Sequence, residues 1–309
     1  MRYNTPSYNV PWAGMNLAGD DADIGVLGVP WDNATSNRRG AAEAPANIRR
    51  CIACADPFTE DGDVIALSLK DYGDVPRDLD WARYFEHVAE RARHALHHRF
   101  ALFLGGDHSV GIPIIRAMSA AVSEPFGILH IDAHADLEDE FEGSRWSHAC
   151  TARRALENAN VHSDGYVYVG LRAPIDDDIR FLAEHPEIQV HSMRAIIDRG
   201  IPAVATDVIA RLSAFKQVYI TLDVDALDPA YAPGTGTPNA GGMTTRELLS
   251  LLRRVVPALN IRAMDIVEVA PPLDHADITS WLAVKVIFEM FGMLQTKWKK
   301  TDHDDNQIQ

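Results

Sequence analysis

The sequence predicts an α/β fold in three layers, with a mostly parallel central sheet covered by helices on both faces. Apolar runs of strand length alternate with segments of helical character at least seven times along the 309 residues, which is typical of strand–helix–strand units. Neither an internal repeat nor a linker divides the chain, and α/β folds of this size often form one unit. We expect a single domain over residues 1–309, with residues 1–22 as an arm over the surface and residues 297–309 as a polar, frayed tail.

Eight apolar runs predict the strands. They are short and rich in valine, isoleucine and leucine, as expected of strands buried in a parallel sheet. In chain order they cover residues 23–29, 64–69, 100–104, 126–129, 166–171, 188–191, 218–222 and 261–269.

The segments between these runs carry helix signals. Apolar residues recur at helical spacing from Trp81 to Leu96, Pro113 lies in a first helical turn where proline is tolerated, and Thr244 with Glu247 forms a capping box. The expected helices cover residues 43–54, 79–98, 110–122, 148–159, 174–184, 202–214, 244–256 and 274–294. Polar, glycine-containing or proline-containing composition predicts loops at 30–40, 138–147 and 231–242.

The most informative stretch is HIDAHADL at residues 130–137, directly after an apolar run. Asp132, His134 and Asp136 alternate with alanines, and side chains two apart in extended backbone point to the same side. Two carboxylates and an imidazole on one side favour a divalent metal site at a strand end. The alternative is a polar loop that leaves the strand.

Two further strand ends carry candidate ligands. The run at 100–104 ends in GGDHS at 105–109, and the run at 218–222 ends in DVDALDP at 223–229. Because ligands bind outside the carboxyl ends of parallel strands, the three ends can share one crevice. The candidate metal ligands are His108, Asp132, His134, Asp136, Asp223 and Asp225. A single zinc ion needs three or four protein ligands, so this set favours two ions bridged by shared carboxylates, and its oxygen and nitrogen donors favour manganese over zinc.

Composition restricts the classes of binding partner and the cellular compartment that we expect for this protein. The formal charge of −15 argues against binding to nucleic acid and favours a cationic substrate. Three cysteines, at 51, 54 and 150, suit a reducing cytosol. The N-terminus lacks a charged-then-apolar leader and no apolar run approaches about 20 residues, so we expect a cytoplasmic protein that does not enter a membrane.

Seven motifs arrive in the order found in one enzyme superfamily. They are GGDHS (105–109), DAHAD (132–136), SHAC (147–150), DVDALDP (223–229), APGTGTP (232–238), GGMT (241–244) and DIVEVAP (265–271). Together they resemble the ureohydrolase signatures of the arginase and agmatinase superfamily. The resemblance implies the three-layer arginase fold, a pair of Mn²⁺ ions (Ni²⁺ or Co²⁺ as substitutes), hydrolysis of a guanidino group to urea and an amine, and a homo-oligomer, commonly a trimer or hexamer.

Within the superfamily the sequence most resembles bacterial and archaeal agmatinases, which convert agmatine to putrescine and urea. His148 is followed by Ala149 and Cys150, and the loop at 138–146 (EDEFEGSRW) lacks the Ser/Thr/Asn-rich sequence of arginases. The loop at 34–45 (ATSNRRGAAEAP) departs from the agmatinase pattern GTSxRPGARxGP. Guanidinobutyrate or an alkylated guanidine is therefore an alternative substrate, and Arg38, Arg39 or Arg145 could bind its acidic end. Arginase activity, a single-zinc deacetylase-like amidohydrolase and an inactive partner subunit rank lower.

The resemblance also implies individual roles. One ion would be bound by His108, Asp132, Asp136 and Asp223, and the other by Asp132, His134, Asp223 and Asp225. Asp136 would also accept a hydrogen bond from the attacking hydroxide. His148 would relay a proton to the leaving amine, the alternative being an ordinary histidine at a helix start after Ser147. Glu268 would bind the guanidinium, the alternative being an ion pair with Arg172. Asp107, Asp228 and Asp265 are predicted to be structural.

Overall fold

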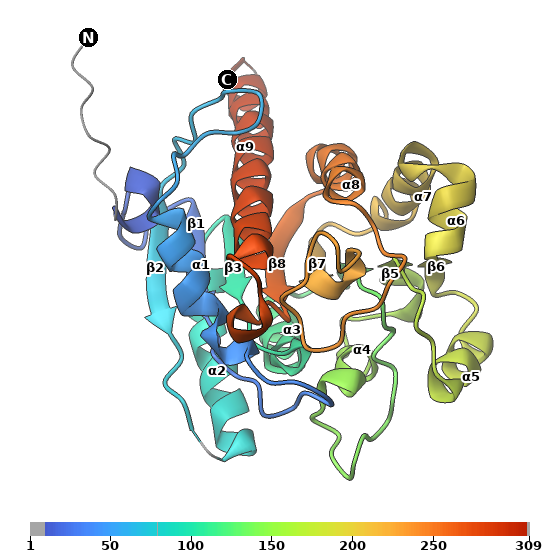
Figure 1. Cartoon of the computed structure of the whole chain (residues 1–309). Coiled ribbons are helices and arrows are strands. Elements are labelled where there is room, and N and C mark those ends of the chain that lie inside the picture. The colour runs from blue at the N-terminus through green and yellow to red at the C-terminus, as the bar shows by residue number, and fades with distance from the viewer. Residues whose placement is uncertain (1–9, 79, 308–309) are drawn as a thin grey trace.

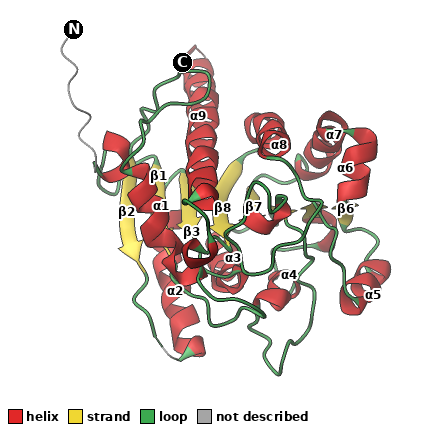
Figure 2. Ribbon diagram, viewed as in Figure 1, coloured by secondary structure: helices red, strands yellow, loops and turns green. Residues whose placement is uncertain are grey.

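Eight parallel strands form the central sheet of the computed structural model, which describes residues 10–78 and 80–307 (Figures 1 and 2). Their spatial order is β2-β1-β3-β8-β7-β4-β5-β6, and each neighbouring pair is parallel. The strands are β1 Ile24–Gly28, β2 Leu69–Asp74, β3 Phe100–Leu104, β4 Gly127–Ile131, β5 Tyr166–Val169, β6 Gln189–His191, β7 Val218–Asp223 and β8 Ile261–Val267. The predicted α/β fold is confirmed.

Helices cover both faces of this sheet (Figure 1). They are α1 Ala44–Ile52, α2 Trp81–Leu96, α3 Gly111–Ala121, α4 Thr151–Ala155, α5 Asp176–Glu184, α6 Met193–Arg199, α7 Ile201–Leu212, α8 Thr245–Ala258 and α9 Ile278–Gln307. One buried apolar cluster joins the sheet to α1 and α6–α9, and a second joins the other face to α2–α5.

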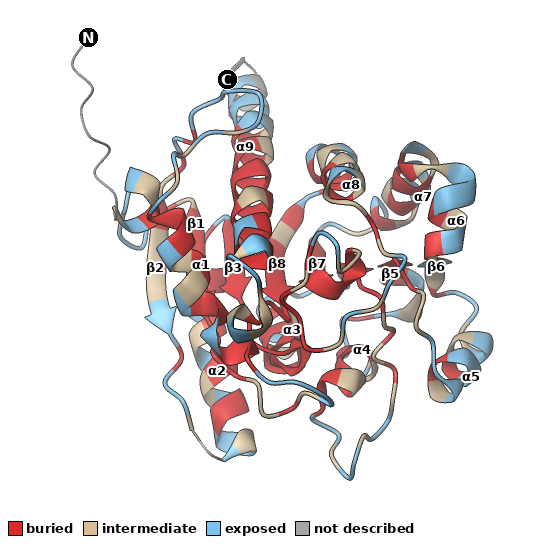
Figure 3. Cartoon of the chain, in the orientation of Figure 1, coloured by how far each residue is buried: buried red, intermediate tan, exposed pale blue. Residues whose placement is uncertain are grey.

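The apolar strands owe their sequence to this burial on both faces. In β3, Phe100, Leu102 and Leu104 belong to one cluster, whereas Ala101 and Phe103 belong to the other. A strand buried on both sides has no polar face, so its sequence is continuously apolar. Figure 3 shows the centre of the sheet as almost entirely buried.

The second strand was predicted at residues 64–69, but β2 begins only at Leu69. The residues before it are hydrogen-bonded to a helix instead of to a neighbouring strand. Gln295 of α9 donates to the carbonyl of Val64 and accepts from the amide of Ala66. The strand itself, β2, is an edge strand with the sequence LKDYGD. A partly exposed edge strand need not be apolar, so apolar runs do not reveal it.

The tail that was expected to fray from residue 297 is helical as far as Gln307, where α9 ends, while residues 308 and 309 lie outside the described residues. Trp298 is 8% exposed and lies in the core cluster, and the guanidinium of Arg99 sits 4.5 Å from its ring centroid. Lys297 donates to the carbonyl of Leu259. These contacts hold the helix at Lys297 and Trp298 against the body of the protein.

Three smaller differences concern local structure. The predicted helix at 148–159 is a 3-10 turn at His148–Cys150 followed by the short α4. Helix α6 was not predicted, and Ser192 caps it by accepting from the amide of Ala195. Of the predicted N-terminal arm, residues 1–9 lie outside the described residues, and the rest is anchored by buried Trp12, whose ring nitrogen donates to Asp71 at 2.8 Å.

Helix α9 is the one helix among the described residues that is long and apolar enough to cross a membrane. In this fold 78% of its apolar window is buried against other parts of the chain. It therefore serves here as a core helix.

Replacing Trp298 with alanine tests the packing of the end of α9. We expect the free energy of unfolding to fall by about 3 kcal/mol, because a large buried ring is lost. Denaturant unfolding measures the change, with the exposed neighbour Lys299→Ala as the control. Equal stability of the two variants would contradict the packing described here.

Candidate metal centre

Four neighbouring strands deliver polar side chains to one edge of the sheet. The strands β3, β8, β7 and β4 are adjacent and parallel, so their carboxyl ends meet. His108 follows β3, Asp132 follows β4, Asp223 ends β7 and Glu268 follows β8. The three strand ends singled out in the sequence thus come together, and β8 adds a fourth.

The first group of candidate ligands surrounds the imidazole of His108. Its Nδ1 atom lies 3.1 Å from Asp132 Oδ2, 3.0 Å from Asp136 Oδ2 and 3.4 Å from Asp223 Oδ2. This nitrogen is buried and lacks a hydrogen-bond partner of good geometry among the described residues. A buried nitrogen without a partner, facing three carboxylates, is suited to a cation.

The second group surrounds His134. Its Nδ1 atom lies 3.0 Å from Asp225 Oδ2 and 3.7 Å from Asp132 Oδ1. Asp132 therefore presents one carboxylate oxygen to each group. A carboxylate shared in this way can bridge two metal ions.

Behind the first group, a chain of hydrogen bonds sets the orientation of His108. Thr221 donates to Asp265 Oδ1 at 2.7 Å, so the hydroxyl oxygen of Thr221 accepts from His108 Nε2 at 2.8 Å. With its proton on Nε2, His108 keeps the Nδ1 lone pair for a metal. Asp265 is buried, and Tyr219 also donates to it at 2.5 Å. Asp265 thus has the supporting position predicted for it.

His130 was missed as part of this site. It is fully buried, its Nε2 lies 2.9 Å from Asp132 Oδ2, and its Nδ1 lies 2.9 Å from the hydroxyl of Tyr166. The alternation that singled out Asp132 also places His130 on the same side of the strand. His130 orients the carboxylate that is shared between the two groups.

Burial of so many carboxylates shapes the electrostatics of the cluster. Burial, followed by repulsion from Asp225 and Asp132, raises the pKa of Asp223 well above its ordinary value. Burial opposes ionisation of Asp132 too, but the three imidazoles around it, His108 first, hold its pKa well below the ordinary value. Close carboxylates of this kind need compensating positive charge. With the free Nδ1 atom of His108, the four carboxylates and two imidazoles fit a pair of divalent ions.

Two of the site residues have left-handed backbone conformations. The φ angles are 54° at Asp136 and 61° at Glu268, a region that residues other than glycine rarely adopt. The carbonyl of Asp136 accepts from Ala152 and Arg153, and the amide of Glu268 donates to Gly106. Strain held in this way is common at functional sites.

Close packing of backbone explains the glycines before His108. A side-chain carbon added to Gly106 would lie 1.8 Å from the carbonyl oxygen of Trp31. Glycine therefore lets the β3 loop lie directly against the loop that begins at Trp31.

Glu268 contacts His148 rather than Arg172. Its Oε1 lies 2.9 Å from His148 Nδ1 and accepts from the amide of His108 at 2.8 Å. Arg172 instead donates to backbone carbonyls, those of Asp225 and Asn239 at 2.6 Å each. The predicted alternative of a Glu268–Arg172 ion pair is therefore wrong.

His148 begins a 3-10 turn that Ser147 caps, which is the local position that the alternative interpretation of this histidine expected. Burial disfavours the charged imidazole, but the carboxylate of Glu268 outweighs it and raises the pKa of His148 to about 9. The side chain lines a cavity beside the ligand cluster.

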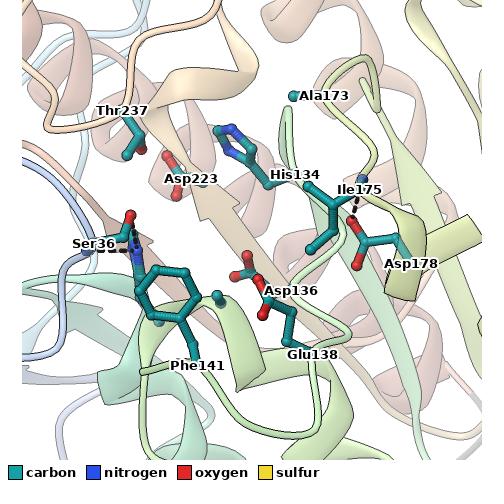
Figure 4. A pocket seen from close by; sticks show the side chains of 12 residues that line it. Ser36, His134, Asp136, Glu138, Phe141, Ala173, Ile175, Asp178, Asp223 and Thr237 are labelled. Carbon is teal, nitrogen blue, oxygen red and sulfur yellow. Dashed lines mark hydrogen bonds between the residues drawn. The ribbon is translucent and has the colours of Figure 1, made fainter. Parts of the chain in front are cut away.

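This cavity has a volume of about 190 Å³ (Figure 4). Its lining combines carboxylates with apolar side chains and comprises Ser36, His134, Asp136, Glu138, Phe141, His148, Ala149, Ala173, Ile175, Asp178, Asp223 and Thr237. Burial, then the charge of Asp178, raises the pKa of Glu138.

The arginines expected to supply a cation here lie elsewhere. Arg39 donates to Asn33, and Arg145 pairs with Asp139 and Glu157. Arg38 is exposed and is not among the lining residues. Across the described part of the chain, no arginine or lysine lines this cavity.

The chain is similar in sequence and in structure to several known proteins. The chain matches the Arginase family over residues 22–292. It is 33% identical to the guanidinopropionase of Pseudomonas aeruginosa, over 88% of this chain and 86% of that protein. It is 32% identical to the agmatinase of Bacillus subtilis, over 88% and 91% respectively. The solved structure of proclavaminate amidino hydrolase from Streptomyces clavuligerus superposes with a TM-score of 0.86 at 28% identity, covering 93% of this chain and 98% of that one.

Replacing His108 with alanine tests the first group of ligands. The variant should bind about one divalent ion per chain instead of two, because Asp132, His134 and Asp225 remain as the second group. Elemental analysis after dialysis against manganese gives the count. The control is His191→Ala, which removes a buried histidine outside the cluster. An unchanged metal count in His108→Ala would show that this histidine is not a ligand.

Proposed function

The chain belongs to the arginase family, and on this premise we propose that it hydrolyses agmatine to putrescine and urea at a binuclear metal centre. The observation that carries the proposal is the pair of ligand groups joined by Asp132. Its ligands would be the two histidines and four aspartates of those groups, and manganese is the metal we propose.

Guanidinium resists hydrolysis because resonance spreads its charge and makes its carbon a poor electrophile. Divalent ions bound here would supply Lewis acidity that lowers the pKa of water and so provides a nucleophile near neutral pH. The chain must then bind the substrate beside the cluster, keep bulk water out and move a proton to the leaving amine. Asp136 lines the cavity and is placed to accept a hydrogen bond from the attacking group.

His148 is the residue we propose for the proton transfer. It lines the cavity and its Nδ1 is held by Glu268. Such acid–base groups typically contribute about 100- to 10,000-fold in rate. Glu268 is itself 1% exposed and does not line the cavity. Its observed contact with His148 supports a role in orienting that histidine, with direct binding of the guanidinium as the alternative role.

The charge of the cavity favours a substrate with a cationic tail. Glu138 and Asp178 add two carboxylates beyond the ligand cluster, while Phe141 and Ile175 offer apolar contact to a methylene chain (Figure 4). An ammonium group is attracted to such a wall, whereas a carboxylate is repelled. Agmatine carries an ammonium at the end of four methylene groups. Guanidinobutyrate, guanidinopropionate and alkylated guanidines are the second candidates, and arginine ranks lower.

Release of urea from a panel of guanidino compounds tests the proposed reaction. The manganese-loaded protein is assayed with agmatine, arginine, guanidinobutyrate, guanidinopropionate and dimethylguanidine. We expect agmatine to have the highest kcat/KM. If only a compound with a carboxylate end were hydrolysed, agmatine would not be the substrate. If no compound released urea, the proposed reaction would be wrong.

Replacing Glu138 with glutamine tests the acidic wall. The change keeps the shape and removes the charge, so the KM for agmatine should rise about 3- to 10-fold while kcat changes little. Guanidinobutyrate should become a relatively better substrate. Glu140→Gln is the matched control, because that exposed residue lies two positions on and outside the cavity lining. Equal KM values in the two variants would remove Glu138 from substrate selection.

A further inference from the structure

The outer edge of the His148 ring is held by one residue of the loop that follows β1. The backbone N–H of Ser36 donates to His148 Nε2 at 2.9 Å, and the hydroxyl oxygen of Ser36 lies 2.8 Å from the same nitrogen. On the opposite side of the ring, Nδ1 is hydrogen-bonded to Oε1 of Glu268. Both nitrogens of the proposed proton donor are therefore engaged by groups that are 112 and 120 residues away in sequence.

The loop that carries Ser36 is itself fixed against the turn that carries His148. The carbonyl of Ala34 accepts from the amide of His148 and from the hydroxyl of Ser147, each at 3.2 Å. On its other side, the amide of Ala34 donates to Asp107 Oδ2 at 2.8 Å. Asp107 is fully buried and comes from the GGDHS motif. The position of Ser36 is thus set from the β3 loop, which also supplies the candidate ligand His108.

These contacts have opposite preferences for the protonation of His148. An N–H group aimed at Nε2 requires a free lone pair there, and so favours the neutral ring with its proton on Nδ1. The carboxylate of Glu268 favours the charged ring. The Ser36 hydroxyl is both donor and acceptor, so it can stay bonded to Nε2 in either state. It also faces the cavity, where a leaving amine would form.

We propose that Ser36 is a positioning residue for His148: its amide and hydroxyl hold Nε2 of the imidazole, and so set the orientation of the ring and which of its nitrogens carries the proton. The proposal rests on the proposed function, because it assigns to His148 the transfer of a proton. The departure of the 34–45 loop from the agmatinase pattern leaves this serine in place, next to Asn37, Arg38 and Arg39.

A set of four variants separates this role from a general effect on the loop. Ser36→Ala removes the hydroxyl but keeps the amide, and Ser36→Thr restores a hydroxyl. Asn37→Ala is the matched control, because the exposed side chain of this neighbouring residue donates to the carbonyl of Gly236 and is not hydrogen-bonded to His148. The fourth is the double variant Ser36→Ala/His148→Ala, compared with His148→Ala alone.

Kinetics with the metal-loaded protein give the first readout. In Ser36→Ala, kcat should fall about 3- to 10-fold, the usual effect of losing one hydrogen bond, while KM and metal content stay near the wild-type values. Ser36→Thr should recover most of the rate. In the His148→Ala background the serine change should have no further effect, because a residue that acts through His148 has nothing left to orient. An independent, multiplicative loss in the double variant would overturn the proposal.

Nuclear magnetic resonance gives a second readout that does not need activity. The ring nitrogens of histidine-labelled protein report which nitrogen carries a proton, and comparison with His148→Ala assigns the His148 signals. These signals should move in Ser36→Ala and stay in place in Asn37→Ala. Unchanged His148 signals in Ser36→Ala would overturn the proposal even if the enzyme were slow.

The two readouts also separate this proposal from the proposed function. If the wild-type protein released no urea from any guanidino compound, the proposed function would fail while the spectra still decided whether Ser36 orients His148. If urea were released normally but Ser36→Ala matched the wild type in both rate and spectrum, the proposed function would stand and the role of Ser36 would fall.

Discussion

The burial of several carboxylates at one edge of a parallel sheet is the constraint on which the rest of this site depends. Asp132, Asp223 and Asp225 are 3% exposed or less, and Asp136 lies beside them in the same cluster. Isolated buried charges of this kind are strongly disfavoured. The imidazoles of His108, His130 and His134 face these aspartates, and a bound cation would offset the remaining repulsion, because no lysine or arginine of the described residues forms an ion pair with the four carboxylates. The cluster therefore indicates metal binding more directly than any single motif does.

The surrounding structure is arranged to hold this cluster in place. Parallel strands bring the three ligand-bearing loops to the same edge, and the Asp265–Thr221 pair directs His108 towards the other ligands. Gly106 allows the β3 loop to pack against the backbone at Trp31. The loop that begins at Trp31 continues to Ser36, which is hydrogen-bonded to His148. The ligand cluster and the proposed proton donor are thus built on the same loop contacts.

The sequence predicted the strands, helices and candidate ligands that have a local periodic pattern. It did not predict features that depend on contacts between residues far apart in the chain. Continuous apolar runs located the interior strands, and alternation after β4 singled out Asp132, His134 and Asp136. The edge strand β2 was not predicted because its sequence is mostly polar and most of it is only partly buried. The end of α9 was not predicted because Trp298 packs against Arg99, which is far away in the chain. For the same reason the sequence suggested Arg172, and not His148, as the partner of Glu268 within the protein. The contact of Ser36 with His148 joins residues 112 positions apart and has no local signal.

The central claim is that the buried aspartates and histidines form one centre for two divalent ions. Titration of the metal-free wild-type protein with Mn²⁺ in a calorimeter, with the thermal midpoint measured at each step, tests it most directly. The account predicts two equivalents bound per chain and a rise in the midpoint at each, since ions that bind the folded state stabilise it. Saturation at one equivalent, or binding that leaves the midpoint unchanged, would contradict it.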